Sequence, residues 1–226
     1  MLTTPGAVVE GALMKAIRIH PAWLAALSCL VLAPALARPP STPAAVWKQI
    51  VPPALVTGVD GKDYRPSCSA LPGTDPTFSF WSRRGKSDKL LVYFEGGGAC
   101  WDNLTCSFPI GSGLPPPAPE FYVPAVPPGT DPASFDGIFR SDRPDNPLRD
   151  WSVVYIPYCS GDLHTGSASR TYANVGNPFL PPSYTLEHRG FDNFMAVLDW
   201  MTKHQRKPKE ILVSGSSAGG YGATAN

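Results

Sequence analysis

The chain has 226 residues, a net charge of +1 and a hydrophobic fraction of 43%. This length and composition allow one domain with a sizeable core. The near-neutral charge and the lack of a basic block argue against a nucleic-acid partner. The 27 prolines favour long irregular connections over a compact helical bundle.

The first 37 residues have the pattern of a signal peptide. Lys15 and Arg18 precede the apolar run 21–37, which ends in a small-residue cleavage pattern. The run is short and interrupted by proline, which argues against a stable membrane span. We therefore predict export into the periplasm or out of the cell, with Met14 as an alternative start of the chain. A retained N-terminal anchor is the other interpretation.

Residues 38–226 are interpreted as the N-terminal portion of a single domain, with a proline-rich lead-in at 38–53. Continuous apolar, β-prone runs predict strands that are buried on both faces. The predicted strands and connections are, in chain order, a short strand at 78–83, a buried strand at 90–94, a proline-rich surface excursion at 111–132, and buried strands at 151–159 and 209–215.

A helix is predicted at 189–204, between the last two strands. Apolar residues recur there at helical spacing, and Lys203 and His204 favour the C-terminal end of the helix dipole. The order of strands and helix predicts an α/β fold with a mostly parallel sheet and helices on both faces.

Four cysteines follow the predicted signal peptide: Cys68, Cys100, Cys106 and Cys159. An even number of cysteines in an exported chain predicts disulfides, and four cysteines allow three connectivities. Free buried thiols are the alternative. No CxxC pair or histidine stands at ligand spacing, so we expect no metal site.

The strand at 90–94 ends in Glu95-Gly96-Gly97-Gly98. Residues without side chains let the backbone approach a substrate closely, and α/β serine hydrolases draw one oxyanion N–H group from such a loop. A phosphate cradle is the alternative. The sequence has neither the Gly-Lys-Ser/Thr of a P-loop nor a G-x-G-x-x-G that opens a helix, so we favour an oxyanion-binding loop.

The strand at 151–159 leads to Asp162 and His164. Two residues apart at a strand end, they are poorly placed for a relay in which the acid and the serine bind opposite imidazole nitrogens. We interpret them as pocket-lining residues, with a structural turn as the alternative. His188 and His204, at the two ends of the predicted helix, are interpreted as surface or capping residues.

The strand at 209–215 leads into a G-x-S-x-G motif, residues 215–219, with Ser217 at its centre. A nucleophile on a sharp strand-to-helix turn has strained backbone angles, and side chains two residues before and after it would collide. The turn also places Ser217 at a helix N-terminus, where the N–H group of Ala218 stabilises a developing oxyanion. Ser216 is the competing nucleophile, but glycines do not flank it in the same way.

Three motifs in this order resemble the pectin acetylesterase family, which includes the Notum carboxylesterases. They are FEGGGACWD (94–102), IPYCSGDLHTG (156–166) and SGSSAGGYG (214–222), and the resemblance covers roughly residues 60–226. It implies a secreted carboxylic ester hydrolase with an α/β-hydrolase-like fold and a Ser-Asp-His triad. We expect no cofactor.

The resemblance assigns roles to individual residues. Ser217 is the nucleophile, and the backbones of Gly97, Gly98 and Ala218 form the oxyanion hole. Notum has a tryptophan where this chain has Gly98, so the side-chain environment differs there. Trp101 lies in the first of the three motifs and is added to the candidate pocket.

The resemblance also bears on the cysteines and on the end of the chain. It implies a Cys100–Cys106 disulfide, with Cys68–Cys159 as the remaining pair. In the family the triad Asp and His lie well downstream of the serine, whereas only a short segment follows Ser217 here. We therefore expect an inactive piece of a longer hydrolase that lacks the C-terminal part of the fold and has an exposed apolar sheet edge.

The predicted function is an exported serine carboxylesterase that removes acetyl groups from a polysaccharide through an acyl-enzyme. Deacylation of a lipid or protein is the first alternative, and it needs a deep apolar pocket. The second is a truncated chain that binds carbohydrate without catalysis, with sugar rings stacked on Trp101, Tyr158, Tyr172 and Tyr184. The sequence leaves the oligomeric state open.

Overall fold

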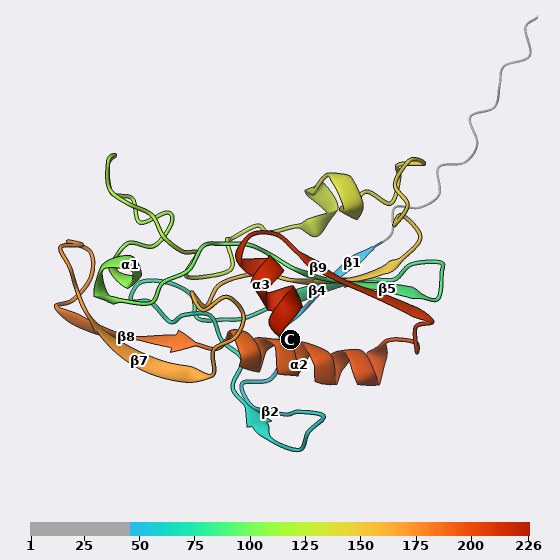
Figure 1. The fold of residues 1–226 in the computed structure, drawn as a ribbon, viewed down its shortest axis with the longest axis horizontal. Helices are drawn as coiled ribbons and strands as arrows, with labels where there is room; N and C mark the ends of the chain where they lie inside the picture. The colour runs from blue at the N-terminus through green and yellow to red at the C-terminus, as the bar shows by residue number, and fades with distance from the viewer. Residues whose placement is uncertain (1–45) are drawn as a thin grey trace, which may run out of the picture. The chain divides into compact units, whose positions relative to one another are not determined.

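The computed structural model describes residues 46–226, so the predicted signal peptide at 1–37 lies outside the described residues. The centre of this part is a five-stranded sheet with the strand order β1-β4-β6-β5-β9 (Figure 1). Its strands are β1 (Trp47–Ile50), β4 (Phe80–Arg83), β5 (Lys89–Phe94), β6 (Ser152–Ile156) and β9 (Glu210–Gly215).

The sheet is mixed, whereas the sequence predicted a mostly parallel one. Strand β5 pairs in parallel with β6 and β9, but β4 pairs in antiparallel fashion with both β1 and β6. The difference arises at one end of the sheet, where residues 47–50 form β1. The prolines around these residues predict a lead-in segment and not a strand. The chain nevertheless has an α/β fold.

Strand β5 buries both faces, as its continuous apolar run predicted. Leu90, Val92 and Phe94 point to one side, where they join a core cluster that includes Val197. Leu91 points to the other side and packs in a separate cluster. Alternate residues of a strand face opposite sides of a sheet, so a strand covered on both sides needs apolar residues throughout.

The helix α2 (Gly190–His204) covers one face of the sheet and confirms the predicted helix. The helix α3 (Ala218–Ala225) follows β9 and adds Ala223 to the same core cluster. Among residues 46–226, no helix combines the length and apolar character needed to cross a bilayer.

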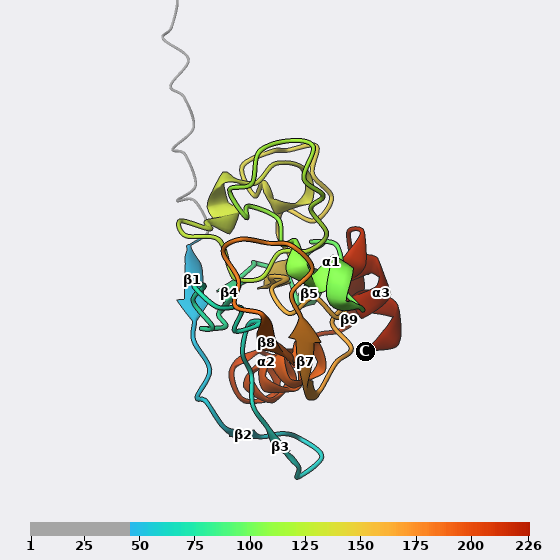
Figure 2. The same cartoon turned by 90° about the vertical axis from the view of Figure 1, so that its left-hand side faces the viewer.

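The opposite face is covered by an irregular segment, residues 135–151, and not by a long helix. The short 3-10 turn η2 (Gly137–Phe139) belongs to this segment, and a second 3-10 turn, η1 (Pro132–Ser134), directly precedes it. Ile138, Phe139 and Leu148 pack there against Leu91. Figures 1 and 2 show α2 and these loops on opposite sides of the sheet. Within residues 46–226, aromatic side chains from a loop fill the second layer where the sequence predicted helices.

Several small elements were not predicted from the sequence. Two antiparallel hairpins lie outside the main sheet: β2 (Val56–Thr57) with β3 (Asp63–Tyr64), and β7 (Ala168–Ala173) with β8 (Ser183–His188). A short helix, α1 (Asn103–Ser107), begins at a capping box made by Asp102 and Thr105. These segments are rich in polar residues, so they lack the continuous apolar runs that indicated the buried strands.

Both disulfides implied by the family resemblance are present. Cys68 pairs with Cys159 across a sequence separation of 91, and Cys100 pairs with Cys106 across a separation of 6. The longer link joins the segment before β4 to the end of β6, inside the core cluster that α2 covers. It therefore closes the part of the chain that contains β4, β5 and β6.

Strand β9 is exposed, although its apolar run predicted burial on both faces. Ile211 is 56% exposed, Leu212 39% and Val213 46%. The reason is position, because β9 is an edge strand whose only ladder within the described residues is to β5. The prediction of an exposed apolar sheet edge is confirmed for residues 46–226.

We expect the two disulfides to contribute unequally to stability. Replacing Cys68 and Cys159 with serine should lower the free energy of unfolding by about 4–5 kcal/mol, because the link closes a long loop of the unfolded chain. The matched Cys100→Ser, Cys106→Ser variant should lose about 2 kcal/mol. Urea unfolding of the oxidised proteins measures both changes. Equal losses would contradict the loop-closure explanation.

Val92 and Val213 form a matched pair, because they face each other across β5 and β9. Val213→Lys should reduce aggregation at the exposed edge, with a change in unfolding free energy of about 0.5 kcal/mol or less. Val92 is only 4% exposed, so Val92→Lys should cost several kcal/mol through a buried unpaired charge. Light scattering and urea unfolding test the pair. Unchanged aggregation in Val213→Lys would show that the β9 edge is not the associating surface.

Candidate active site

Ser217 occupies a strained turn between β9 and α3. Its backbone angles are φ 50° and ψ −121°, a region that residues with side chains rarely adopt. A conformation of this kind costs about 1–3 kcal/mol and persists only where the surroundings impose it. Ser217 is exposed at this turn, and the next residue, Ala218, is buried at the first position of α3. This is the geometry that the G-x-S-x-G motif predicted.

The flanking glycines are required for the reason given by the sequence analysis. A Cβ atom at Gly215 would collide with the carbonyl of Gly219, and a Cβ atom at Gly219 would collide with the carbonyl of Phe94. The backbone N–H of Ser216 donates to that same Phe94 carbonyl at 3.2 Å. The turn is therefore pressed against the carboxyl end of β5.

The glycine loop at 96–98 lies directly beside this turn. A Cβ atom at Gly96 would stand 2.5 Å from the Ser216 carbonyl oxygen and 2.9 Å from the Ser217 Cβ. Side chains at Gly97 and Gly98 would collide with the Tyr158 ring and the Phe121 carbonyl, and Gly98 has a φ of 73°. The fold thus brings the two predicted backbone elements, from β5 and β9, into contact.

Asp162 organises a turn and a helix start. Its carboxylate accepts hydrogen bonds from the Ser160 hydroxyl at 2.7 Å and from the N–H groups of His164 at 3.1 Å, Gly166 at 3.1 Å and Gly190 at 2.7 Å. Gly190 is the first residue of α2, where a carboxylate is favoured by the helix dipole. Of the two interpretations, the structural turn describes Asp162.

His164 is buried behind the turn, with 1% of its surface exposed. Its Nε2 atom lies 2.9 Å from the carbonyl oxygen of Glu95, and its ring packs edge-on against Phe94 and Tyr158. Burial lowers the pKa of His164 below its usual range, so the imidazole is neutral. His164 does not line an open pocket, because Glu95, Phe94 and Tyr158 enclose it.

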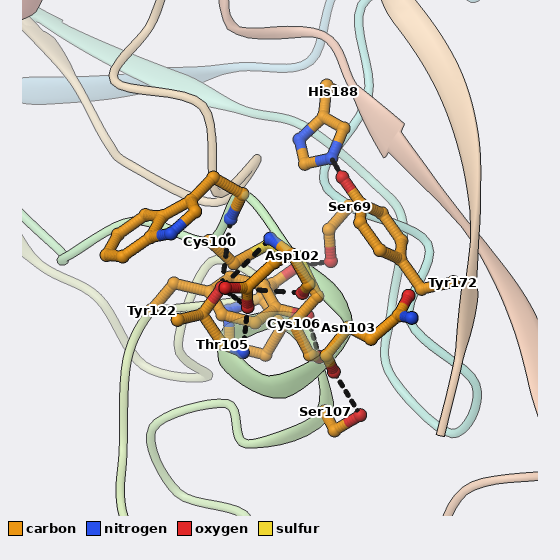
Figure 3. Close-up of a disulfide and its surroundings, with 12 residues drawn as sticks. Ser69, Cys100, Asp102, Asn103, Thr105, Cys106, Ser107, Tyr122, Tyr172 and His188 are labelled. Carbon is orange, nitrogen blue, oxygen red and sulfur yellow. Dashed lines mark hydrogen bonds between the residues drawn. A yellow bond between two sulfur atoms is a disulfide. The ribbon is translucent and has the colours of Figure 1, made fainter. Parts of the chain in front are cut away.

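The other two histidines of the described residues also have partners away from Ser217. His188 is buried, and its Nε2 lies 2.8 Å from the Tyr172 hydroxyl (Figure 3). Its Nδ1 lies 2.9 Å from the Ser160 carbonyl oxygen. Its prediction as a surface or capping residue is wrong, because β8 directs it beneath the β7–β8 hairpin. His204 does cap α2, through the Trp200 carbonyl at 2.9 Å.

The disulfide Cys100–Cys106 lies beside His188, and one ligand atom from each of the three residues falls within 4.8 Å of the others. The two sulfurs are bonded to each other, so neither is available as the thiolate that a metal needs. The cluster is therefore a packed support for the loop that follows the glycines. Trp101, next to Cys100, is 63% exposed.

The aromatic residues considered for sugar stacking separate into two groups. Trp101 is exposed, whereas Tyr158, Tyr172 and Tyr184 are 4% exposed or less. The hydroxyls of Tyr172 and Tyr184 bond to His188 and Ser107. Three of the four therefore hold the protein together, and only Trp101 has a ring face open to a ligand.

Glu95 is a site residue that the sequence analysis did not single out. Its carboxylate accepts the N–H of Tyr158 at 3.2 Å, which links the end of β5 to the segment after β6. Burial raises the pKa of the Glu95 carboxyl. The sequence did contain a signal for this role, because Glu95 is a charged residue between an apolar strand and three glycines. Its neighbours partly bury such a position.

Comparison with known proteins gives a consistent result. The family model described as Pectinacetylesterase matches residues 62–226. The palmitoleoyl-protein carboxylesterase NOTUM of Schmidtea mediterranea is 31% identical over 62% of this chain and 24% of its own length. Pectin acetylesterase 4 of Arabidopsis thaliana is 29% identical over 66% of this chain and 33% of its own length.

A third relative, the palmitoleoyl-protein carboxylesterase notum2 of Xenopus laevis, is 26% identical over 66% of this chain and 28% of its own length. The chain thus spans about a quarter to a third of the length of these curated relatives. The family match covers most of the chain and includes the glycine loop, the turn at 160–166 and the strained serine. The chain belongs to the pectinacetylesterase family.

Proposed function

We propose that residues 46–226 supply the nucleophile and the oxyanion donors of a serine carboxylesterase with an α/β-hydrolase-like fold. The observation that carries this proposal is the strained backbone of Ser217, exposed between β9 and α3 with the glycine loop against it. Strain at an exposed hydroxyl, built from glycines that leave no room for side chains, is typical of a nucleophile elbow.

In the proposed reaction, the Ser217 Oγ attacks the ester carbonyl and its proton passes to a base. The negative charge on the carbonyl oxygen is stabilised by the N–H group of Ala218 and by those of Gly97 and Gly98. Collapse of this intermediate expels the alcohol and leaves an acyl-serine, which water then hydrolyses.

We propose that the base and its orienting acid come from outside residues 46–226. The nitrogens of His164 and His188 that form hydrogen bonds face Glu95, Tyr172 and Ser160, and His204 bonds at the far end of α2. Much of each relative's length is not spanned by this chain, which leaves room for such residues. Residues 46–226 alone should therefore be acylated slowly and turn over poorly.

The proposed substrate is an acetyl ester on a polysaccharide. The family model and the Arabidopsis relative carry names that refer to pectin acetyl esters, and Trp101 is exposed close to the glycine loop. Three cavities of the described part, of about 350, 520 and 470 Å³, are lined by other residues than Ser217, Gly97 and Gly98. A long acyl group would need a deep apolar pocket beside Ser217, whereas an acetyl group would not.

Deacylation of a protein or lipid is the second candidate, because relatives named palmitoleoyl-protein carboxylesterases match at similar identity. We also propose export. The two disulfides support it, because such links persist in oxidising compartments.

Ser217 should be the group that reacts with an activated ester. With p-nitrophenyl acetate, mass spectrometry should find one acetyl group on the peptide that contains residues 214–222, and Ser217→Ala should abolish it. Ser216→Ala is the matched control and should retain acylation. Turnover should be about 10⁴-fold or more below that of a complete triad, because the base is missing. Acylation that survives Ser217→Ala would refute the assignment.

Acyl-chain length separates the two substrate classes. Acylation of Ser217 by p-nitrophenyl acetate should be at least about tenfold faster than by p-nitrophenyl decanoate, since one or two poorly accommodated methylenes already change discrimination by such factors. Stopped-flow release of nitrophenol gives both rates. A faster reaction with the decanoate would favour the lipid or protein deacylase.

A further inference from the structure

We propose that His164 is a positioning residue that fixes the glycine loop relative to the helix carrying Ser217. The inference rests on the proposed function, because it concerns how the oxyanion donors are held. His164 is 1% exposed, so it acts through other residues and not on the substrate.

On the loop side, His164 binds the first carbonyl after β5. The pairing of β5 with β9 ends where Ser216 donates to the Phe94 carbonyl at 3.2 Å. The next carbonyl, that of Glu95, instead receives Nε2 of His164 at 2.9 Å. A carbonyl oxygen only accepts, so Nε2 carries the proton and Nδ1 does not. The imidazole thus holds the backbone in place for one residue beyond β5, up to the first glycine of the loop.

On the helix side, the imidazole fills a place that α3 leaves open. A Cβ atom at Gly222 would stand 2.8 Å from both Cβ and Cδ2 of His164. Near the end of α3, the side-chain amide of Asn226 donates to the His164 carbonyl at 3.1 Å. Glycine destabilises the interior of a helix compared with alanine. We therefore attribute the glycine at position 222 to the space that the His164 side chain needs.

The backbone of His164 is itself held in an unusual conformation. His164 and Leu163 have φ values of 64° and 59°, and the carboxylate of Asp162 accepts the His164 N–H at 3.1 Å. The ring lies between Phe94 and Tyr158, with centroid distances of 5.1 and 5.0 Å. The chain therefore bends so that one N–H group points at the Glu95 carbonyl while the ring edge faces α3.

Two variants separate the hydrogen bond from simple packing. His164→Phe keeps an aromatic ring between Phe94 and Tyr158 but removes the donor. His164→Gln keeps an N–H donor near the position of Nε2 but removes the ring. If the hydrogen bond positions the loop, acylation of Ser217 by p-nitrophenyl acetate falls about tenfold to a hundredfold in His164→Phe, because one lost oxyanion donor costs up to about a thousandfold. His164→Gln stays within about threefold of wild type.

A second matched pair tests the contact from the helix side. Gly222→Ala places a methyl group against His164, whereas at Gly220 the nearest atom to an added Cβ is the Gly215 carbonyl oxygen at 3.9 Å. Both substitutions raise helix propensity equally. We expect Gly222→Ala to lower the acylation rate about fivefold or more, and Gly220→Ala to leave it unchanged.

Hydrogen–deuterium exchange measures how firmly the glycine loop is held, and this measurement does not depend on the proposed esterase activity. The amides of Ala99 and Val123 hold the loop, because they donate to the carbonyls of Phe121 and Gly97 at 2.9 and 2.8 Å. They should exchange at least about tenfold faster in His164→Phe and Gly222→Ala than in wild type, His164→Gln or Gly220→Ala. If wild type shows no Ser217-dependent acylation, the proposed function fails, and exchange alone decides the role of His164. Three outcomes would each overturn the proposal. The first is an acylation rate and amide exchange in His164→Phe that match wild type, and the second is an equal loss of acylation rate in both His164 variants. The third is the same acylation rate and exchange in the Gly222→Ala and Gly220→Ala variants.

Discussion

The geometry of the site depends on the carbonyl oxygen of Phe94, at the end of β5. It accepts the N–H of Ser216, and its position leaves no room for a side chain at Gly219. The strained backbone of Ser217 is thereby held against the carboxyl end of β5 and is not part of a free loop. Strain persists only where surrounding contacts outweigh it, and β5 supplies them through packing on both of its faces.

The three segments of the candidate site follow three neighbouring parallel strands. The glycine loop follows β5, the turn at 160–166 follows β6, and the serine turn follows β9. Parallel strands end at the same edge, so residues distant in sequence converge there, as is usual for sites in α/β sheets. The antiparallel strands β1 and β4 extend the sheet on the far side of β6 and contribute width without adding to this edge.

Sequence reasoning succeeded where a local pattern has a single physical cause. The apolar run at 90–94, the helix at 190–204 and the glycines at 215 and 219 are of this kind. The predicted burial of β9 was wrong. An apolar run indicates a strand, but it does not indicate how many neighbouring elements cover that strand. The disulfide partners came from the family resemblance, since spacing alone leaves three pairings open.

The turn at 160–166 shows why a motif can be recognised without its role being clear. Asp162 and His164 are close in sequence, yet their partners lie in different elements. The carboxylate binds the first N–H of α2, whereas the imidazole binds the Glu95 carbonyl and packs on α3. Those partners are 28 and 69 residues away along the chain, so no local pattern indicates them.

The surroundings of the two side chains also differ. The carboxylate of Asp162 accepts four hydrogen bonds, and one of them comes from the first N–H group of α2. An imidazole enclosed by aromatic rings is stable only when neutral, and the lowered pKa of His164 follows from that enclosure. The same turn therefore combines a carboxylate that binds the start of α2 with a buried imidazole behind Ser217, where desolvation disfavours the protonated ring.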